Sequence, residues 1–446
     1  MRIHFIAIGG AIMHSLAIEL KKNGHIVSGS DDIIYEPARS NLMLHQILPK
    51  KEGWLSKSID ASIDMIILGM HARSDNPELL KAKKLNIPIV SFPEYIFKYA
   101  ENKTRVVIAG SHGKTTITSM ILHVLNDYEL KVDYLLGAKI NSLNNLVQLQ
   151  NNSVILIEGD EYFSSPIDRQ PKFMHYQPDI LVVSGVSWDH VNVYPTIESY
   201  HNAFTSIINN VIKRNGQVFY CGDDSFLSKL SINPIYAKPY YLPDYFVENS
   251  KFYIQNQYGE IPLNIFGQHN LYNLEAAQLV CEKLGISSEM FFKSIQTFSG
   301  ADKRLQLINK NTKNSCVYYD FAHSPSKVQA TINAVKELYP DRYLITCLQL
   351  YTFSSLNIDF IPNYADVFDN SNEVWIYIDE LALLQKNLLE ISDAFLLKVI
   401  NHHNVRVIKN KITLQNNLNS CKFINTNLLL MSSGNFSGLD LKSILN

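Results

Sequence analysis

The sequence predicts an α/β protein made of three consecutive units, each with a parallel sheet and helices on its faces. Three observations carry this prediction. Short apolar runs alternate with helix-like segments along most of the chain, which is the pattern of strand–helix–strand units. Polar stretches at residues 98–105 and 297–306 interrupt the alternation. A chain of 446 residues is also long enough for about three domains.

The first predicted unit covers residues 1–102, with a boundary near Asn102. The helix after its first strand is expected to end at Gly24, because glycine commonly stops a helix. The apolar start resembles a short secretion signal, but His4 and a glycine pair interrupt it, and a buried strand explains it better. The expected strands lie at 3–8, 25–31, 64–70 and 87–92, and the expected helices at 11–24 and 77–86.

The second predicted unit covers residues 103–297 and the third covers residues 298–446. In the second, strands are expected at 106–110, 153–161 and 179–187, with helices from Thr115, at 200–212 and within 267–286. In the third, a strand at 316–322, a helix at 326–340 and a strand at 343–350 repeat the pattern, which weakens toward the end.

Composition excludes several classes of protein. The net charge of −2 gives no reason to expect nucleic acid or an anionic membrane as a partner. Five scattered cysteines without CxxC spacing argue against a disulfide framework or a zinc ribbon and fit a reducing compartment. No apolar run approaches the ~20 residues that span a bilayer, so a cytoplasmic protein is expected.

A phosphate-binding loop is predicted at residues 110–116, which read Gly-Ser-His-Gly-Lys-Thr-Thr. The loop joins a strand to a helix, so its backbone N–H groups would surround the positive helix end. Lys114 can reach the β- and γ-phosphates, and the hydroxyl of Thr115 can bind Mg²⁺. The usual first glycine is replaced by Ile108, which shortens the loop and leaves its chemistry intact.

Acidic and imidazole groups follow the next two strands. Glu158, Asp160 and Glu161 end one strand, and Asp189 and His190 follow the other. Ligands of open α/β sheets collect at the carboxyl ends of strands, and Mg²⁺ needs few protein oxygens besides the phosphates. These groups therefore predict a metal and substrate cleft beside the loop.

Taken together, these motifs resemble those of the Mur ligase family, over essentially the whole chain. The resemblance implies three domains: a Rossmann-like domain for a UDP-sugar, a central P-loop ATPase domain, and a Rossmann-like domain for the amino acid or peptide. The motifs that carry it are "GSHGKTT" (110–116), "EGDE" (158–161), "DHVNVYP" (189–195), "FGQHNLYN" (266–273), "FSGADKRLQ" (298–306) and "DFAHSP" (320–325).

The resemblance also implies roles for individual residues. Lys114, Glu158 and His190 would be catalytic, and Thr115, Glu158 and His190 would bind Mg²⁺. Gly9, Gly10 and Asp31 would hold the UDP-sugar. The residues implied in ATP binding are Gly110, Ser111, His112, Gly113, Lys114, Thr115, Thr116, Asn270, Asn273, Arg304 and Asp320.

Within the family, the N-terminal sequence points to the branch that binds UDP-N-acetylmuramate. The stretch 158–185 resembles the ligases that add the recycled tripeptide L-Ala-γ-D-Glu-meso-diaminopimelate, and this is the expected activity; L-alanine ligation is the alternative. A monomer or weak homo-oligomer is expected. The chain departs from the family at Ala7, where glycine is common, and at Phe204, where some branches carry a modified lysine.

The chemistry implied by the resemblance is attack of the muramate carboxylate on ATP to give an acyl phosphate and ADP, followed by attack of the amine on the acyl phosphate.

Two other classes of function have weaker support in the sequence. A NAD-dependent oxidoreductase would rest on a lone glycine motif without G-x-G-x-x-G spacing. A non-catalytic nucleotide sensor would need a broken ATP site, whereas Lys114, Thr115, Glu158 and His190 are all present.

Overall fold

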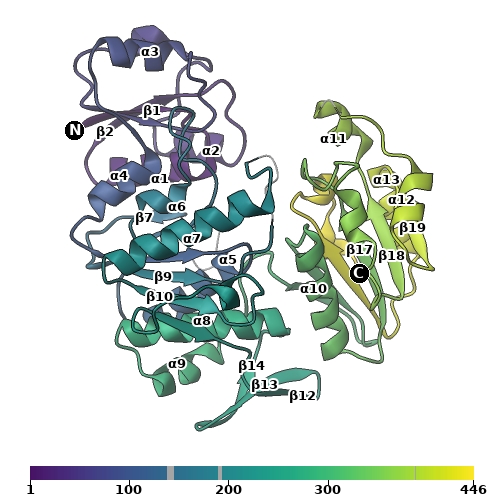
Figure 1. The fold of residues 1–446 in the computed structure, drawn as a ribbon. Coiled ribbons are helices and arrows are strands. Elements are labelled where there is room, and N and C mark those ends of the chain that lie inside the picture. Colours follow the sequence, from purple (N-terminus) through teal and green to yellow (C-terminus); the bar gives the residue numbers. More distant parts are fainter. Residues whose placement is uncertain (138–144, 189–192, 387, 446) are drawn as a thin grey trace. The chain divides into compact units, whose positions relative to one another are not determined.

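The computed structural model describes residues 1–137, 145–188, 193–386 and 388–445. The described chain forms four sheets and two compact units. The first unit contains residues 1–186, 193–241 and 276–287, and the second chiefly residues 242–275 and 288–445 (Figure 1). The predicted α/β fold class is confirmed, while the division into three domains at residues 102 and 297 stays a prediction. None of the described helices is long and apolar enough to cross a bilayer.

The first sheet is parallel and has the order β2-β1-β3-β4. Apart from Arg2, the residues of β1 and β3 are buried, because helices cover both faces of such a sheet. The first helix ends at Lys22, two residues before the expected Gly24. The elements are β1 (Arg2–Ile6), α1 (Ala11–Lys22), β2 (Ile26–Ser30), α2 (Ala38–Leu44), β3 (Met65–Leu68), α3 (Pro77–Lys84), β4 (Ile89–Ser91) and α4 (Phe92–Tyr99).

The second sheet, also in the first unit, has seven strands in the order β11-β10-β9-β5-β8-β6-β7, antiparallel only at β7. Helix α5 packs on β5 and β8, and α7 on β9 and β10 (Figure 1). The elements are β5 (Thr104–Ala109), α5 (Lys114–Asp127), β6 (Asp133–Leu135), β7 (Val147–Gln148), β8 (Val154–Glu158), α6 (Lys172–His175), β9 (Ile180–Val183), α7 (Ile197–Lys213), β10 (Gln217–Cys221) and β11 (Ala237–Tyr240).

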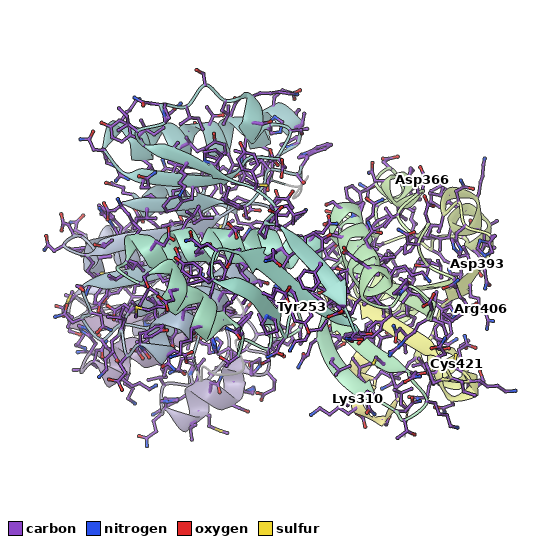
Figure 2. All side chains as sticks on the ribbon, turned by 90° about the horizontal axis from the view of Figure 1, so that it is seen from below. Tyr253, Lys310, Asp366, Asp393, Arg406 and Cys421 are labelled. Carbon is purple, nitrogen blue, oxygen red and sulfur yellow. The ribbon has the colours of Figure 1, made fainter. Side chains whose placement is uncertain are left out.

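The second unit combines a three-stranded antiparallel sheet with a six-stranded sheet in the order β15-β16-β20-β17-β18-β19. Tyr253 lies on the middle strand of the small sheet, and Lys310 and Arg406 mark the two outer strands of the large one (Figure 2). The strands are β12 (Tyr245–Glu248), β13 (Lys251–Asn256), β14 (Gly259–Leu263), β15 (Gln306–Lys310), β16 (Cys316–Asp320), β17 (Tyr343–Gln349), β18 (Glu373–Tyr377), β19 (Val405–Ile408) and β20 (Thr426–Met431).

Two apolar cores cover the two faces of the six-stranded sheet. Tyr318 belongs to one core and its neighbour Tyr319 to the other, because successive side chains of a strand point to opposite faces. The remaining helices are α8 (Gln268–Lys283), α9 (Ser288–Ile295), α10 (Pro325–Leu338), α11 (Glu380–Gln385), α12 (Asp393–Val399) and α13 (Lys411–Ser420). Short 3-10 turns are η1 (Ser56–Ser58), η2 (Leu227–Lys229), η3 (Ile361–Tyr364), η4 (Phe436–Gly438) and η5 (Leu441–Ser443).

Candidate active site

The predicted phosphate loop lies between β5 and α5, and two glycines make its path possible. Gly110 has φ +123°, and a Cβ there would lie 2.4 Å from the Ser184 Oγ. Gly113 has φ +78° and caps α5, which begins at Lys114. The first N–H groups of a helix have no partner within it, so residues 113–116 present donors for an anion. The amide of Ser111, in contrast, donates to the Gly185 carbonyl at 2.9 Å.

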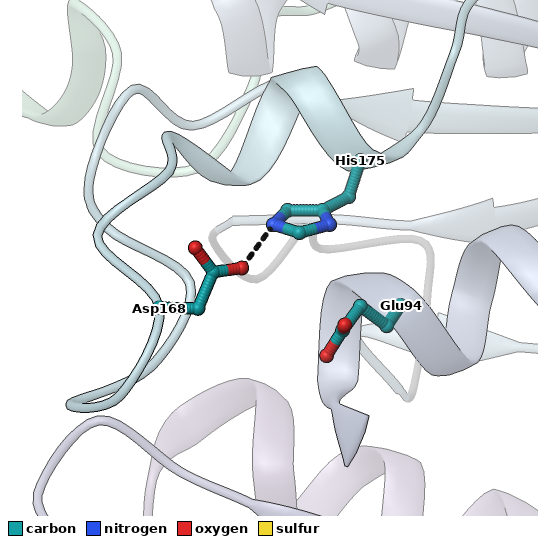
Figure 3. Close-up of side chains that lie close together, drawn as sticks. All are labelled: Glu94, Asp168 and His175. Atoms are coloured by element: carbon teal, nitrogen blue, oxygen red, sulfur yellow. Dashed lines mark ion pairs between the residues drawn. The ribbon is translucent and has the colours of Figure 1, made fainter.

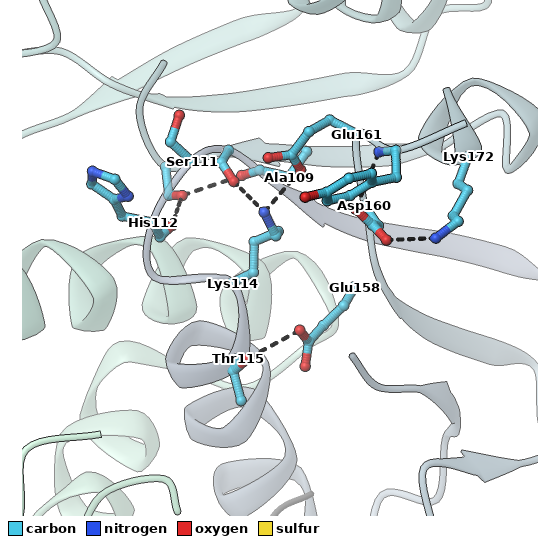
Figure 4. A network of polar contacts seen from close by, with 12 residues as sticks. Ala109, Ser111, His112, Lys114, Thr115, Glu158, Asp160, Glu161 and Lys172 are labelled. Carbon is cyan, nitrogen blue, oxygen red and sulfur yellow. Dashed lines mark hydrogen bonds and ion pairs between the residues drawn. The ribbon is translucent and has the colours of Figure 1, made fainter. Parts of the chain in front are cut away.

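The side chain of Lys114 is held inside the loop. Its Nζ donates to the Gly110 carbonyl at 2.6 Å and to Glu161 Oε2 at 3.0 Å (Figure 4). Burial alone would lower the pKa of Lys114. The charge of Glu161, followed by those of Asp160 and Glu158, outweighs burial and raises the pKa. The loop therefore carries a fixed positive charge where the phosphates of a nucleotide would lie.

Glu161 is fully buried and is surrounded by tyrosines. Tyr200 donates to Glu161 Oε1 at 3.2 Å and also meets the Ser111 Oγ at 3.0 Å. Tyr194 donates to the Glu161 carbonyl at 2.6 Å, and burial together with the Glu161 charge raises the pKa of Tyr194, so its hydroxyl stays protonated. These contacts hold Glu161 against Lys114. The sequence indicated Glu161 only as one of three acids at a strand end, and nothing in it singled out Tyr200.

Thr115 and Glu158 form the second polar pair of the site. The Thr115 Oγ1 donates to Glu158 Oε2 at 3.0 Å, and both side chains are buried (Figure 4). Two hard oxygen donors beside a helix N-terminus fit the ligand preference of Mg²⁺, so these residues can hold that ion. Asp160, between the two glutamates in sequence, instead pairs with Lys172 at 2.7 Å and is partly exposed.

Two further positions of this region were singled out in the sequence, His190 and Phe204. His190 lies outside the described residues, so its role as a metal ligand stays a prediction. Phe204, at the position of the modified lysine, is fully buried, with its ring centroid 5.4 Å from that of Phe173 and 5.1 Å from that of Tyr200. It therefore packs in the core and offers no metal ligand.

The structure brings together the three residues predicted to hold the UDP-sugar. The Gly9 amide donates to Asp31 Oδ2 at 2.7 Å, and Gly10 caps the N-terminus of α1. Burial raises the pKa of Asp31 to about 6, although the Gly9 amide acts in the opposite direction. Ala7 has φ +68°, a left-handed conformation that favours glycine, so its methyl group adds backbone strain to this turn.

The remaining predicted residues belong to the second unit. Both oxygens of Asp320 accept backbone N–H groups, from Leu305 and Ala322, each at 2.5 Å. The Arg304 guanidinium lies 4.7 Å from the centre of the Phe321 ring, which follows Asp320 in the chain. Asp320 thus shapes the turn that carries Arg304.

Asn270 and Asn273 form a second local arrangement, at the start of α8. The Asn270 Nδ2 donates to the Phe266 carbonyl at 2.9 Å, and the Asn273 Nδ2 donates to Asn270 Oδ1 at 3.3 Å. Both side chains are buried. A role in ATP binding stays a prediction for Asn270, Asn273, Arg304 and Asp320.

Comparison with known proteins places these motifs in a family. Two family models match the chain: "Mur ligase family, catalytic domain" over residues 2–104, and "Mur ligase middle domain" over residues 108–281. A UDP-N-acetylmuramate–L-alanine ligase of Aquifex aeolicus (strain VF5) is 31% identical over 384 residues, which cover 82% of this chain and 82% of that protein.

Two solved structures share the fold over nearly the full length. The UDP-N-acetylmuramate–alanine ligase of Thermotoga maritima superposes with a TM-score of 0.71 at 20% identity, and covers 98% of this chain and 97% of its own. A murein peptide ligase from Psychrobacter arcticus 273-4 gives a TM-score of 0.66 at 19% identity, with 100% of both chains covered. At such identities the likeness concerns the fold alone.

Proposed function

Because this chain belongs to the Mur ligase family, we propose that it joins the carboxylate of UDP-N-acetylmuramate to the amine of L-alanine. Members of the family are ATP-dependent ligases that form an amide bond. The chain is accordingly an ADP-forming ligase of peptidoglycan biosynthesis that uses ATP and Mg²⁺.

One observation in the structure carries the ATP-dependent step. The Lys114 ammonium is fixed between the Gly110 carbonyl and the buried Glu161, at the N-terminus of α5. In the proposed reaction the lactyl carboxylate attacks the γ-phosphorus of ATP and ADP leaves. The amine then attacks the acyl phosphate carbon, and phosphate leaves. Lys114 and the amides of the loop would neutralise charge on the phosphoryl oxygens, so the protein needs no nucleophile of its own.

Mg²⁺, when bound, would neutralise phosphate oxygens and orient them for transfer. Thr115 and Glu158 are the described residues that would hold it, because they place two oxygens beside the loop. The UDP-sugar would lie at Gly9, Gly10 and Asp31, where a turn leads into the N-terminus of α1.

The sequence relatives support L-alanine as the amine substrate better than the tripeptide expected from sequence motifs, because the Aquifex protein of matching length is named an L-alanine ligase. One observation keeps the tripeptide as a second candidate. Tyr162 after the acidic motif and the run Lys-Phe-Met-His-Tyr-Gln-Pro at 172–178 resemble the tripeptide-adding branch. Local similarity of this kind weighs less than a 31% identity that extends over 82% of the chain.

Phosphate release with Mg²⁺-ATP and UDP-N-acetylmuramate tests the proposal, with either L-alanine or the tripeptide added. We expect turnover with L-alanine, and its loss in Lys114→Ala. Lys172→Ala is the matched control, because Lys172 pairs with an acid of the same strand end but lies outside the loop. Turnover with the tripeptide alone would replace L-alanine by the second candidate. If the folded protein released no phosphate with either amine, the ligase activity itself would be contradicted.

A further inference from the structure

A second group of potential metal ligands lies in the first unit, in residues that the proposed ligase reaction does not use. Glu94 comes from α4, Asp168 from the loop after β8, and His175 from the end of α6 (Figure 3). One ligand atom of each lies within 4.8 Å of the ligand atoms of the other two. We propose that these three side chains bind one divalent transition-metal ion of the Zn²⁺ class.

The spacing of the three ligand atoms suits such an ion. In a tetrahedral site with bonds near 2.1 Å, neighbouring ligand atoms are about 3.4 Å apart. The His175 Nε2 lies 2.9 Å from Asp168 Oδ2. One ligand atom from each of the three residues lies within 4.8 Å of the other two. Metal binding would draw the three ligand atoms toward one centre by small rotations of their side chains.

The state of the histidine nitrogen supports a metal more than a simple ion pair. The His175 Nε2 is buried and makes no hydrogen bond, although the Asp168 carboxylate is close. An imidazole that donated its proton to Asp168 would satisfy both groups. A buried nitrogen that lies 2.9 Å from a carboxylate oxygen without donating to it can instead offer its lone pair to a cation.

The two carboxylates are already oriented by their own neighbours. Glu94 Oε2 accepts from the Ser91 amide at 2.6 Å and from the Ser91 Oγ at 2.8 Å. Asp168 accepts from the Ser164 Oγ at 3.0 Å and from the Gln170 amide at 2.9 Å. Hydrogen bonds of this kind fix metal-binding carboxylates in place and are typical of the surroundings of metal sites.

The choice of metal follows from the ligand set and from the space beside it. One imidazole and two carboxylates suit Zn²⁺ and its neighbours, whereas Mg²⁺ prefers oxygen ligands alone. Glu94 and His175 also line a cavity of about 590 Å³, which has room for water to complete the coordination. The cations that line the same cavity are Lys213 and Arg214, and the Arg214 guanidinium is bound to Gln177 and to the Pro178 carbonyl.

A bound ion would tie α4 to the segment that ends in α6. Lys172, at the start of α6, pairs with Asp160, which lies next to Glu161 in the chain. The ion would thus stabilise the segment that begins beside Lys114. Its role would be structural, because its ligands include none of the residues assigned to ATP or to the UDP-sugar.

Zinc binding by the full chain, stripped of metal with a chelator, tests this site. The readouts are bound zinc after gel filtration, the affinity by titration calorimetry, and the visible absorption of the Co²⁺ form. We expect one equivalent of Zn²⁺ to be lost, or its affinity to fall at least about tenfold, in His175→Gln and in Glu94→Gln. Mg²⁺ added in place of Zn²⁺ should not raise the melting temperature through this site.

Two further variants make the result decisive. Glu94→Gln keeps the capping box with Ser91, because glutamine also serves at that position, so it should fold even if His175→Gln does not. His123→Gln is the matched control, since His123 lies 3.6 Å from the carboxylate of Asp127 and is not one of the three proposed ligands. Equal zinc stoichiometry and affinity in wild type, Glu94→Gln and any folded His175→Gln would overturn the proposal.

Discussion

The Nζ of Lys114 lies 3.0 Å from Oε2 of Glu161, a carboxylate that is fully buried. This pair joins the start of α5 to the segment that follows β8, and so connects the phosphate loop to the neighbouring strand. A buried carboxylate needs a compensating charge, and a loop lysine needs a fixed direction. The pair therefore neutralises the buried charge of Glu161 and fixes the orientation of the Lys114 side chain.

Replacement of Glu161 by glutamine should destabilise the protein and disturb the loop. The change keeps the shape of the side chain but leaves the Lys114 charge less compensated, with an expected loss of about 1–3 kcal/mol in the free energy of unfolding. Urea denaturation measures it. Asp160→Asn is the control, because its partly exposed pair with Lys172 should contribute less than about 1 kcal/mol. Equal effects of the two variants would contradict the structural role of the buried pair.

The hydroxyl of Thr115 should set the Mg²⁺ requirement. Thr115→Val removes the oxygen that meets Glu158 and keeps the shape of the side chain, so the Mg²⁺ concentration for half-maximal activity should rise at least about tenfold. Thr118→Val is the control on the same helix, because the Thr118 Oγ1 is buried without a hydrogen bond. An unchanged Mg²⁺ profile in Thr115→Val would argue against this residue as a ligand.

The contribution of Asp31 to the stability of the protein should fall as the pH rises through its titration. Its folded pKa is raised from 3.8 to about 6, so the folded state holds the proton more tightly than the unfolded state. Below the unfolded pKa of 3.8 Asp31 is neutral in both states and does not oppose folding. Above the folded pKa of about 6 it is charged in both states, which lowers the free energy of unfolding by roughly 2–3 kcal/mol. Asp31→Asn should therefore be more stable than wild type at pH 7 and similar to it below pH ~4.

Melting temperatures measured from pH 4 to pH 7.5 test the Asp31 prediction. Asp32→Asn is the contrasting variant. The hydrogen bond with Asp31 is the largest cause that lowers the pKa of Asp32, so the charged form of Asp32 stabilises the fold above its unfolded pKa. Removal of that charge should therefore lower the melting temperature near pH 5, where Asp31 still holds the proton that it donates to Asp32. A pH profile of Asp31→Asn parallel to that of wild type would refute the prediction.

Gly110→Ala should be much more damaging than Gly24→Ala, although both glycines have a positive φ. Gly24→Ala meets nothing within 4 Å, so only the left-handed backbone opposes it, at about 1–2 kcal/mol. A Cβ on Gly110 would also lie 2.4 Å from the Ser184 Oγ and 2.8 Å from the Ser184 amide. We expect an additional loss of about 1–3 kcal/mol and weaker ATP binding. Denaturation and nucleotide titration of both variants measure the difference.

The sequence by itself determined the features that depend on neighbouring residues. Strand–helix alternation predicted the α/β class, and the glycine, lysine and threonine of the loop predicted an anion site at the start of α5, because a strand, a turn and a helix N-terminus are formed by contiguous chain. In the structure Glu158 lies beside Thr115, since carboxyl ends of adjacent parallel strands meet at one edge of a sheet, while the role of the pair in binding Mg²⁺ stays a prediction.

Only the tertiary structure decided which of these groups touch. The pairing of Lys114 with Glu161, the support of Glu161 by Tyr200, and the meeting of Glu94 with His175 join segments far apart in the chain. Such contacts depend on how helices pack on the sheets and on which rotamers that packing allows, and a residue pattern carries neither. The raised pKa of Asp31 has the same origin, because burial is a property of the folded chain and not of the residue.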